Sequence, residues 1–377
     1  MKTLKKYLKR MLVVILSLIG ILIIAYLLFV NFYPSFGGDI SKERQKEYEK
    51  SRNYKDGKFV NQKDVPKDLS FGETVKLAYA FFTTKVPNGR PKQNLEVEKL
   101  DSLEVADYKG GSRLIWYGHS AFLLQMDEKN ILIDPMFGEV AAPHPLLGEN
   151  RFNREMPLAI EQLPKIDAVL ISHDHYDHLD YKSIIKLKDK VEIFYVPLGV
   201  GVHLEKWGIK KKSVVELDWW QEVNYKGLQF VCTPAQHFSG RKFGGNQTTL
   251  WSSWVIISAT DRLYFSGDSG YGNHFKEIGK KYGPFDFAMM ECGQYNTRWP
   301  DIHMFPEETA QAGLDVSAKI VMPIHWGAFK LALHSWTDPI ERVTQKADEL
   351  GLQLVAPQIG EVISLNKLDQ RVTDKWW

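Results

Sequence analysis

The sequence predicts an α/β protein with an amino-terminal transmembrane helix. From about residue 110 to the carboxyl terminus, short apolar runs alternate with amphipathic stretches, which is typical of strands that alternate with helices. Residues 11–30 form an uncharged run in which nearly every residue is apolar. In the stretch 171–180, three histidines and three aspartates follow directly on a short β-branched run. Because α/β folds place their chemistry at such strand ends, we expect the site here.

Composition indicates a globular protein and argues against nucleic acid as a partner. Of 377 residues, 44% are hydrophobic and 25% are charged, which suits one large domain or two ordinary ones. The net charge is +2, and five lysines and arginines lie before residue 11, so no basic surface is indicated elsewhere. Cys232 and Cys292 lie in apolar runs, which favours buried free thiols, with a disulfide as the alternative.

The amino terminus predicts a membrane anchor. Residues 1–10 are basic, and residues 11–30 contain no charge over about the length that a helix needs to cross a bilayer. The basic flank predicts a cytoplasmic amino terminus and a catalytic domain on the outer side of the cell membrane. A cleaved signal peptide is the alternative, but no small-x-small cleavage site follows Val30. We therefore expect an uncleaved single-pass anchor.

A connector is expected at residues 31–100, packed on a main domain at residues 101–370. The connector suits either a short helix or a solvated tether up to about residue 66, and it predicts a helix at 72–82 whose aromatic face packs on the main domain. The main domain is expected to begin with strands at 112–125 and 131–134, joined by a hairpin-like turn.

The stretch 171–180 has the residue types of a metal site. Four ligand-type side chains lie within six positions, namely His173, His175, Asp177 and His178. Imidazole nitrogen and carboxylate oxygen are good ligands for zinc and related divalent ions. Four such groups on one turn, between a strand and a helix capped by Asp180, indicate two ions rather than one. A solvated polar turn with incidental histidines is the alternative.

Several motifs together resemble one family. They are SHDHYDHLDY at 172–181, PAQH at 234–237, FSGDSGY at 265–271, GPFD at 283–286 and IHWG at 324–327. The H-x-H-x-D-H pattern resembles the metallo-β-lactamase fold hydrolases, and the other motifs, in the same order, resemble the N-acylphosphatidylethanolamine-hydrolysing phospholipases D. The resemblance covers residues 110 to 365 and implies a four-layer α/β/β/α sandwich, the metallo-β-lactamase fold.

The resemblance also implies the ligands of two divalent ions per chain, with zinc expected. One ion would be held by His173, His175 and His237, the other by Asp177, His178 and His325, with Asp268 between them. His303 resembles a family active-site histidine that is not a ligand, so the expected catalytic residues are Asp177, Asp268 and His303. Two adjacent ions would lower the pKa of a bound water, and the resulting hydroxide would attack phosphorus or a carbonyl.

Other residues receive supporting roles. We expect a structural role near the site for His119, a position behind the ligands for Asp134, and a place at the mouth of the site for His334. Four aromatic residues suit either contacts with acyl chains or an ordinary core: Tyr295, Trp299, Phe305 and Trp326.

The expected function is zinc-dependent hydrolysis of a phosphodiester. The resemblance implies a phospholipase D-type reaction on N-acylphosphatidylethanolamine or a related phospholipid, which leaves phosphatidic acid. A membrane anchor favours a lipid substrate, because it raises the effective concentration of the enzyme at the bilayer. A lactonase or other ester hydrolase is an alternative on the same fold. A non-enzymatic metal-binding or scaffold protein is a third, against which the complete ligand set argues. A homodimer is a further possibility that the sequence leaves open.

Overall fold

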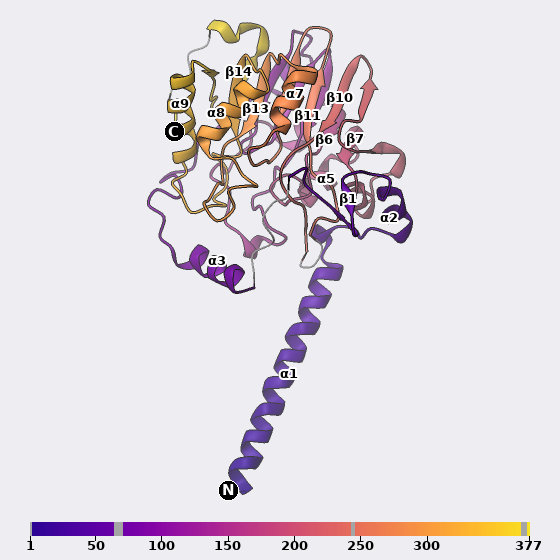
Figure 1. Ribbon diagram of the computed structural model, residues 1–377, viewed down its shortest axis with the longest axis vertical. Coiled ribbons are helices and arrows are strands. Elements are labelled where there is room, and N and C mark those ends of the chain that lie inside the picture. The colour runs from indigo at the N-terminus through magenta and orange to yellow at the C-terminus, as the bar shows by residue number, and fades with distance from the viewer. Residues whose placement is uncertain (1, 64–70, 243–245, 371–374) are drawn as a thin grey trace.

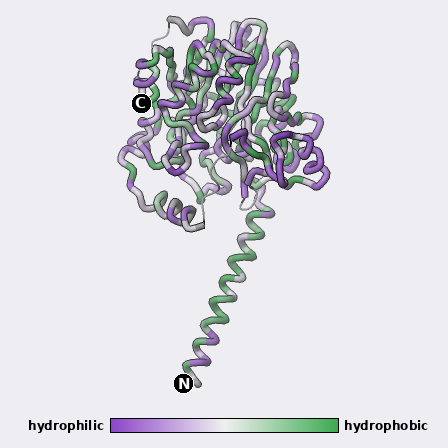
Figure 2. The backbone as a smooth tube through the Cα atoms, viewed as in Figure 1, coloured by the Kyte–Doolittle hydropathy of each residue, from purple (hydrophilic) through white to green (hydrophobic). Residues whose placement is uncertain are grey.

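The computed structural model describes residues 2–63, 71–242, 246–370 and 375–377. Its longest helix, α1 (Lys2–Phe32), points away from a compact domain (Figure 1). Figure 2 shows α1 as hydrophobic over most of its length, and its residues are almost all exposed. Thr3–Phe32 is long and apolar enough to cross a membrane, which makes it a candidate span. An apolar helix with no protein around it requires another apolar environment.

Among the residues that the structure describes, the domain contains two mixed sheets of seven strands each. The first has the order β16-β3-β4-β5-β6-β7-β8, with antiparallel pairs from β16 to β5 and parallel pairs from β5 to β8. Its strands are β3 (Arg113–Trp116), β4 (Phe122–Met126), β5 (Lys129–Ile133), β6 (Ile166–Leu170), β7 (Val191–Pro197), β8 (Val214–Leu217) and β16 (Val362–Ser364).

The second sheet repeats this plan with the order β15-β14-β13-β12-β11-β10-β9. Its pairs are antiparallel from β9 to β12 and parallel from β12 to β15, a likeness between the halves that the sequence does not show. Its strands are β9 (Glu222–Tyr225), β10 (Leu228–Thr233), β11 (Ser253–Ile257), β12 (Arg262–Phe265), β13 (Phe287–Glu291), β14 (Ile320–Ile324) and β15 (Gln353–Leu354).

The two sheets pack face to face, with helices outside both. Phe122 of the first sheet meets Phe265 of the second at a ring distance of 6.4 Å within one continuous core. A second core lies beneath α5 (Tyr181–Leu187) and α6 (Gly201–Lys206) on the outer face of the first sheet. The second sheet carries α7 (His274–Tyr282), α8 (Pro306–Asp315) and α9 (Asp338–Leu350), as Figure 1 shows. The predicted four-layer α/β/β/α sandwich is therefore confirmed.

One strand prediction was wrong. The expected strand at 112–125 is two antiparallel strands, β3 and β4, separated by a tight turn. Within this turn Gly118 and His119 have φ angles of 86° and 56°. Extended backbone cannot pass through such angles, so the strand ends at Trp116. The break places His119 in the turn at the end of β3, where the strand leaves the sheet.

The first part of the connector is folded. It forms α2 (Lys42–Tyr48), β1 (Tyr54–Lys55) and β2 (Lys58–Phe59), and it buries Tyr48, Tyr54 and Phe59 in the main core. A solvated tether is thus wrong for this part. The predicted helix is α3 (Phe71–Thr83), where Phe81 stacks on Trp299 at 6.5 Å, while Tyr79 is exposed and the side chain of Phe82 lies outside the described residues.

Short helices complete the chain. They are α4 (Ser102–Ala106) and the 3₁₀ turns η1 (Pro34–Phe36), η2 (Pro145–Leu147), η3 (Ile160–Gln162), η4 (Lys211–Ser213) and η5 (Leu365–Gln370). The two cysteines are free and buried, as expected.

Candidate metal centre

The candidate ligands follow the ends of strands from both sheets. His173 to His178 come directly after β6, and His237 follows β10. Asp268 follows β12, and His325 follows β14. β12 and β14 belong to the parallel strands of the second sheet, and β6 belongs to those of the first. The carboxyl ends of these strands meet at one edge of the sandwich.

A buried aspartate supports the metal turn from behind. Asp134 Oδ1 accepts a hydrogen bond from Ser172 N at 2.7 Å, and Asp134 Oδ2 accepts one from Ser172 Oγ at 2.5 Å. The same Oδ2 lies 2.7 Å from His178 Nδ1. This contact orients the imidazole and leaves Nε2 for the site, as outer partners of metal ligands do. Asp134 therefore lies behind the candidate ligands, where we expected it.

The first cluster brings together three imidazoles and one carboxylate. His175 Nδ1 lies 2.9 Å from His173 Nε2 and 3.2 Å from His237 Nε2. Asp268 Oδ2 lies 3.8 Å from the Nε2 atoms of His173 and His237. Burial, reinforced by neighbouring histidines, holds the pKa of His173 well below its usual value, and burial does the same for His237. These imidazoles are therefore neutral, which is the form that binds metal.

The second cluster is centred on Asp177. Its Oδ2 lies 3.1 Å from His325 Nε2 and 3.5 Å from His178 Nε2. Asp268 also reaches this cluster, with Oδ1 3.1 Å from His178 Nε2 and Oδ2 3.0 Å from His325 Nε2. Burial disfavours charge on His178 and His325, but the nearby carboxylates, Asp268 foremost, outweigh it and raise both pKa values well above their usual range.

These donor sets fit divalent cations. Among the described residues, His178 Nε2 and Asp268 Oδ1 are buried and lie 3.1 Å apart, yet neither makes a hydrogen bond, although buried polar atoms in folded proteins nearly always do. Within the first cluster, three imidazole nitrogens also face one another. A neutral imidazole carries a proton on only one of its two nitrogens, so these three atoms cannot all be paired with one another. A cation in each cluster would satisfy these atoms. The structure thus brings all seven predicted ligand residues together.

His119 lies closer to the site than we expected. Its Nε2 is 2.8 Å from Asp177 Oδ2, and it groups with Asp177, His178 and His325 as a possible fourth donor. Burial first, and then the nearby His325, lower its pKa to about 3, so the ring is neutral. The preceding Gly118 was the available signal in the sequence.

His303 and Glu291 form a pair beside the second cluster. His303 Nδ1 lies 3.2 Å from Glu291 Oε1, and the His303 ring stacks 5.2 Å from that of His325. Glu291 is fully buried, and its Oε2 accepts a hydrogen bond from Met304 N at 2.9 Å. The sequence analysis missed Glu291. An acid at the end of the apolar strand β13 was its only signal.

The backbone around His325 is tightly constrained. His325 has a φ of 67°, and its backbone N donates to His119 O at 3.1 Å. A Cβ at Gly293 would lie 1.9 Å from the carbonyl oxygen of His325, so only glycine fits there. Such left-handed backbone at non-glycine residues concentrates at functional sites.

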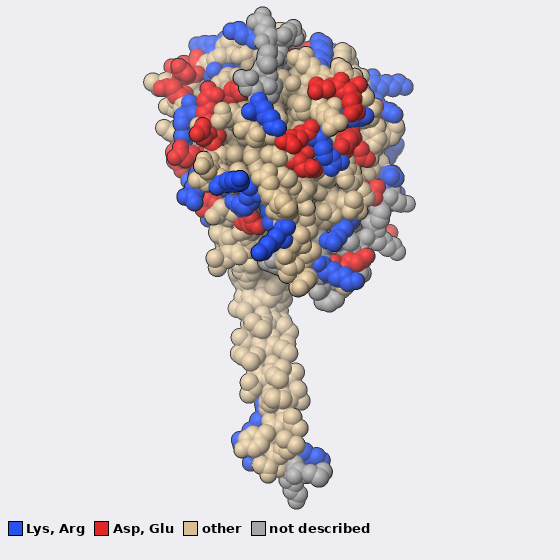
Figure 3. Space-filling view, turned by 90° about the vertical axis from the view of Figure 1, so that its left-hand side faces the viewer, with Lys and Arg blue, Asp and Glu red and all other residues tan. Residues whose placement is uncertain are grey.

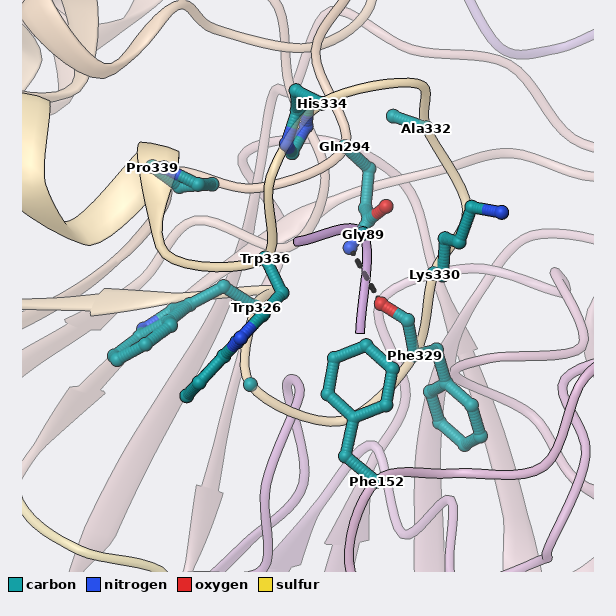
Figure 4. Close-up of a pocket in the computed structure, with 11 residues that line it drawn as sticks. Gly89, Phe152, Gln294, Trp326, Phe329, Lys330, Ala332, His334, Trp336 and Pro339 are labelled. Carbon is teal, nitrogen blue, oxygen red and sulfur yellow. Dashed lines mark hydrogen bonds between the residues drawn. The ribbon is translucent and has the colours of Figure 1, made fainter. Parts of the chain in front are cut away.

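An aromatic cavity lies beside the centre (Figure 4). Trp326, Trp336, Phe152 and Phe329 line it, and Gln294 Nε2 donates to Phe329 O across it at 3.1 Å. Phe329 also meets the His119 ring at 5.3 Å, which connects the cavity to the centre.

His334 and the four aromatic candidates take different places. His334 lines the cavity and stacks on Tyr295 at 4.4 Å, outside both clusters. Tyr295 and Trp326 are buried, which agrees with a core role, whereas Trp299 and Phe305 are partly exposed.

Comparison with known proteins identifies the superfamily. The family profile described as "Beta-lactamase superfamily domain" matches residues 129–326, more than half of the chain. The chain belongs to this superfamily of metallo-hydrolases. An uncharacterized protein of Mycobacterium tuberculosis is 40% identical over 320 residues, which cover 83% of this chain and 84% of that protein.

One further relative indicates the family within the superfamily, and one solved structure shows the shared fold. The N-acyl-phosphatidylethanolamine-hydrolyzing phospholipase D 1 of Caenorhabditis elegans is 32% identical over 247 residues, 62% of this chain and 69% of that protein. The isothiocyanate hydrolase from Delia radicum gut bacteria superposes with a TM-score of 0.54 at 20% identity, over 67% of this chain and 98% of that chain, which shows the shared fold.

Proposed function

We propose that this protein is a membrane-anchored, zinc-dependent phosphodiesterase that hydrolyses N-acylphosphatidylethanolamine or a related phospholipid in a phospholipase D-type reaction. The observation that carries the proposal is the position of Asp268, whose two oxygens face histidines of both clusters. One carboxylate between two donor sets suits a pair of divalent ions. The name of the Caenorhabditis elegans relative supports the substrate class.

In this proposal each cluster holds one ion. His173, His175 and His237 would hold the first and Asp177, His178 and His325 the second, and Asp268 would offer an oxygen to each cluster. Bound divalent ions supply an activated water at neutral pH and offset negative charge on a phosphodiester. His119, 2.8 Å from Asp177 Oδ2, would hold that carboxylate in place.

The pair of His303 and Glu291 is suited to proton transfer. His303 Nδ1 lies 3.2 Å from Oε1 of the buried Glu291, and with a proton on Nδ1 this contact fixes the imidazole and leaves Nε2 available to substrate. From this position Nε2 can hydrogen-bond a phosphate oxygen or pass a proton to the departing alcohol oxygen of N-acylethanolamine. Asp177, largely buried between histidines, keeps its charge because His178 and His119 hold its pKa well below the usual range against the effect of burial.

The anchor completes the proposal. We take residues 1–10 as a cytoplasmic tail, 11–30 as the membrane span, 31–100 as a connector and 101–370 as the hydrolase domain on the outer side. The long apolar helix with a basic amino-terminal end supports this orientation. Figure 3 shows the surface of the helix free of charged side chains between that basic end and the domain.

Lipid mass spectrometry tests the reaction. Purified full-length protein is incubated with mixed membrane phospholipids that include N-acylphosphatidylethanolamine, and the variant D268N serves as the control. We expect N-acylethanolamine and phosphatidic acid to appear together and only with the unaltered protein. Release of free fatty acid without either product would instead indicate an ester hydrolase on the same fold.

A further inference from the structure

The end of the anchor helix is joined to the metal turn through Arg241. The buried guanidinium donates from Nε and Nη2 to Ser35 O in η1, at 2.9 and 2.7 Å. Its Nη1 donates to Leu179 O at 2.8 Å and to Asp174 O. One side chain therefore connects the first residues after α1 to both ends of the turn that carries His175 and Asp177.

A second connection runs through His203. Gly38 N donates to His203 Nδ1 at 3.1 Å, and His203 Nε2 lies 3.3 Å from Asp174 Oδ2. Gly37, with a φ of 74°, allows this approach, since a Cβ there would lie 2.1 Å from His203 Nδ1. The Phe36 ring also meets that of Tyr176 edge-on at 6.5 Å. Residues 34–38 therefore fix the orientation of the metal turn relative to α1.

An exposed leucine turn lies beside the same end of α1. Leu146 and Leu147 of η2 are 87% and 61% exposed. His144 holds this turn in place, since its Nδ1 accepts from Leu146 N at 3.1 Å and its ring lies 6.2 Å from Phe29 and 5.4 Å from Tyr33. Ser35 Oγ also donates to Pro143 O at 2.5 Å. The turn thus stands level with the last residues of the candidate span.

The surroundings of this turn agree with contact to lipid. Phe29 belongs to the apolar helix, so a group packed near it lies at the depth where the helix leaves the bilayer. Figure 1 shows α3 at the same end of the domain, and its Tyr79 is 69% exposed. Apolar side chains that water would surround are instead covered if this end of the domain rests on the membrane.

We propose that the turn at residues 143–148 inserts Leu146 and Leu147 into the leaflet from which α1 emerges. With α1 as the first contact and this turn as the second, the metal centre is held at a fixed orientation against the bilayer. Substrate then reaches the centre from that leaflet. This inference rests on the proposed anchor and deepens the proposed function, because it names the lipid surface as the partner of this end of the domain.

Fluorescence of a labelled cysteine tests the insertion without any assay of activity. The variant L146C in the full-length protein is labelled with the dye NBD and reconstituted into vesicles of phosphatidylethanolamine and phosphatidylglycerol. Cys232 and Cys292 are fully buried and burial raises their thiol pKa values, so labelling is selective. We expect a blue-shifted emission that lipids spin-labelled along the acyl chain quench.

Leu103 provides the matched control. Its side chain is 70% exposed in α4. This helix contacts β4 through a hydrogen bond from Gln125 Nε2 to Val105 O, at the end of the sheet opposite the metal turn. NBD at L103C should show neither the shift nor the quenching. Emission from L146C equal to that from L103C would overturn the proposal. A blue shift that spin-labelled lipids do not quench would mean that protein covers the turn, and would overturn it as well.

A double variant separates this inference from the proposed reaction. L146E/L147E should lower turnover of lipid in bilayers about tenfold or more and leave turnover of the same lipid in mixed micelles unchanged. Equal turnover by the variant and the unaltered protein in bilayers would contradict the inference. If the unaltered protein cleaves no phospholipid in either form, the proposed reaction fails, and the fluorescence result alone decides the insertion.

Discussion

Replacement of Asp268 by Asn removes the charge shared by the two clusters while it keeps the size of the side chain. Asp268 lies 3.0–3.1 Å from nitrogens of the second cluster and 3.8 Å from nitrogens of the first. Loss of an outer partner of a ligand typically costs 10–100-fold in metal affinity or activity. Loss of a carboxylate that faces both clusters should reduce activity more than this. We therefore expect kcat to fall at least ~100-fold, which corresponds to an increase of about 2.7 kcal/mol in the activation free energy.

Metal content and turnover are measured on the same preparations of full-length protein. We expect about two equivalents of divalent metal in the unaltered protein and about one or fewer in D268N, as for a site that needs a bridging carboxylate. D127N is the matched control, because Asp127 is exposed in the hairpin turn between β4 and β5, at the opposite end of the sheet. Full metal content and turnover in D268N, with native near-ultraviolet circular dichroism, would refute the assignment of Asp268.

Three further predictions concern other residues and the anchor. H303A should lower kcat by about 10²–10⁴-fold with unchanged metal content, which elemental analysis checks, and E291Q should lower it less; loss of an ion in H303A would make His303 a ligand. Burial lowers the pKa of His274 to about 3, below its ordinary value. Below about pH 6.5 the unfolded chain therefore binds a proton at this residue that the folded chain does not, so the free energy of unfolding decreases as the pH falls. Between pH 7.5 and 5 the unaltered protein should lose about 2 kcal/mol more than H274Q in urea unfolding, and equal losses would contradict this. Added protease should remove the domain from bacterial spheroplasts while the amino-terminal sequence of the membrane form begins at or near Met1; protection of the domain would reverse the orientation.

Local patterns predicted much of the fold and the centre of the site. The ligand types from His173 to His178 lie together in the sequence, so spacing alone was enough to indicate metal. His237, Asp268 and His325 are separated by long stretches, and only the order of the family motifs connected them. The structure brings them together because β10, β12 and β14 belong to one sheet, and that sheet faces the one in which β6 precedes the metal turn.

Long-range contacts account for what the sequence analysis missed. Glu291 ends an apolar strand, and its partner His303 lies beyond a loop, so no local pattern marks the pair. The break before His119 depends on two residues with positive φ, of which only Gly118 is a recognisable signal. Arg241 joins Ser35 to the metal turn over more than 200 positions, a contact that only the folded chain reveals.

The fate of the oxygen atom from water distinguishes hydrolysis at phosphorus from hydrolysis of a carboxyl ester. Full-length protein is incubated with N-acylphosphatidylethanolamine in water enriched in oxygen-18, and the lipids are analysed by mass spectrometry. Attack of water on phosphorus forms a new phosphorus–oxygen bond and breaks the bond to the oxygen of N-acylethanolamine, which leaves with a proton. Hydrolysis at phosphorus should place one oxygen-18 atom in phosphatidic acid and none in N-acylethanolamine. Label in a released fatty acid, with no phosphatidic acid formed, would contradict it.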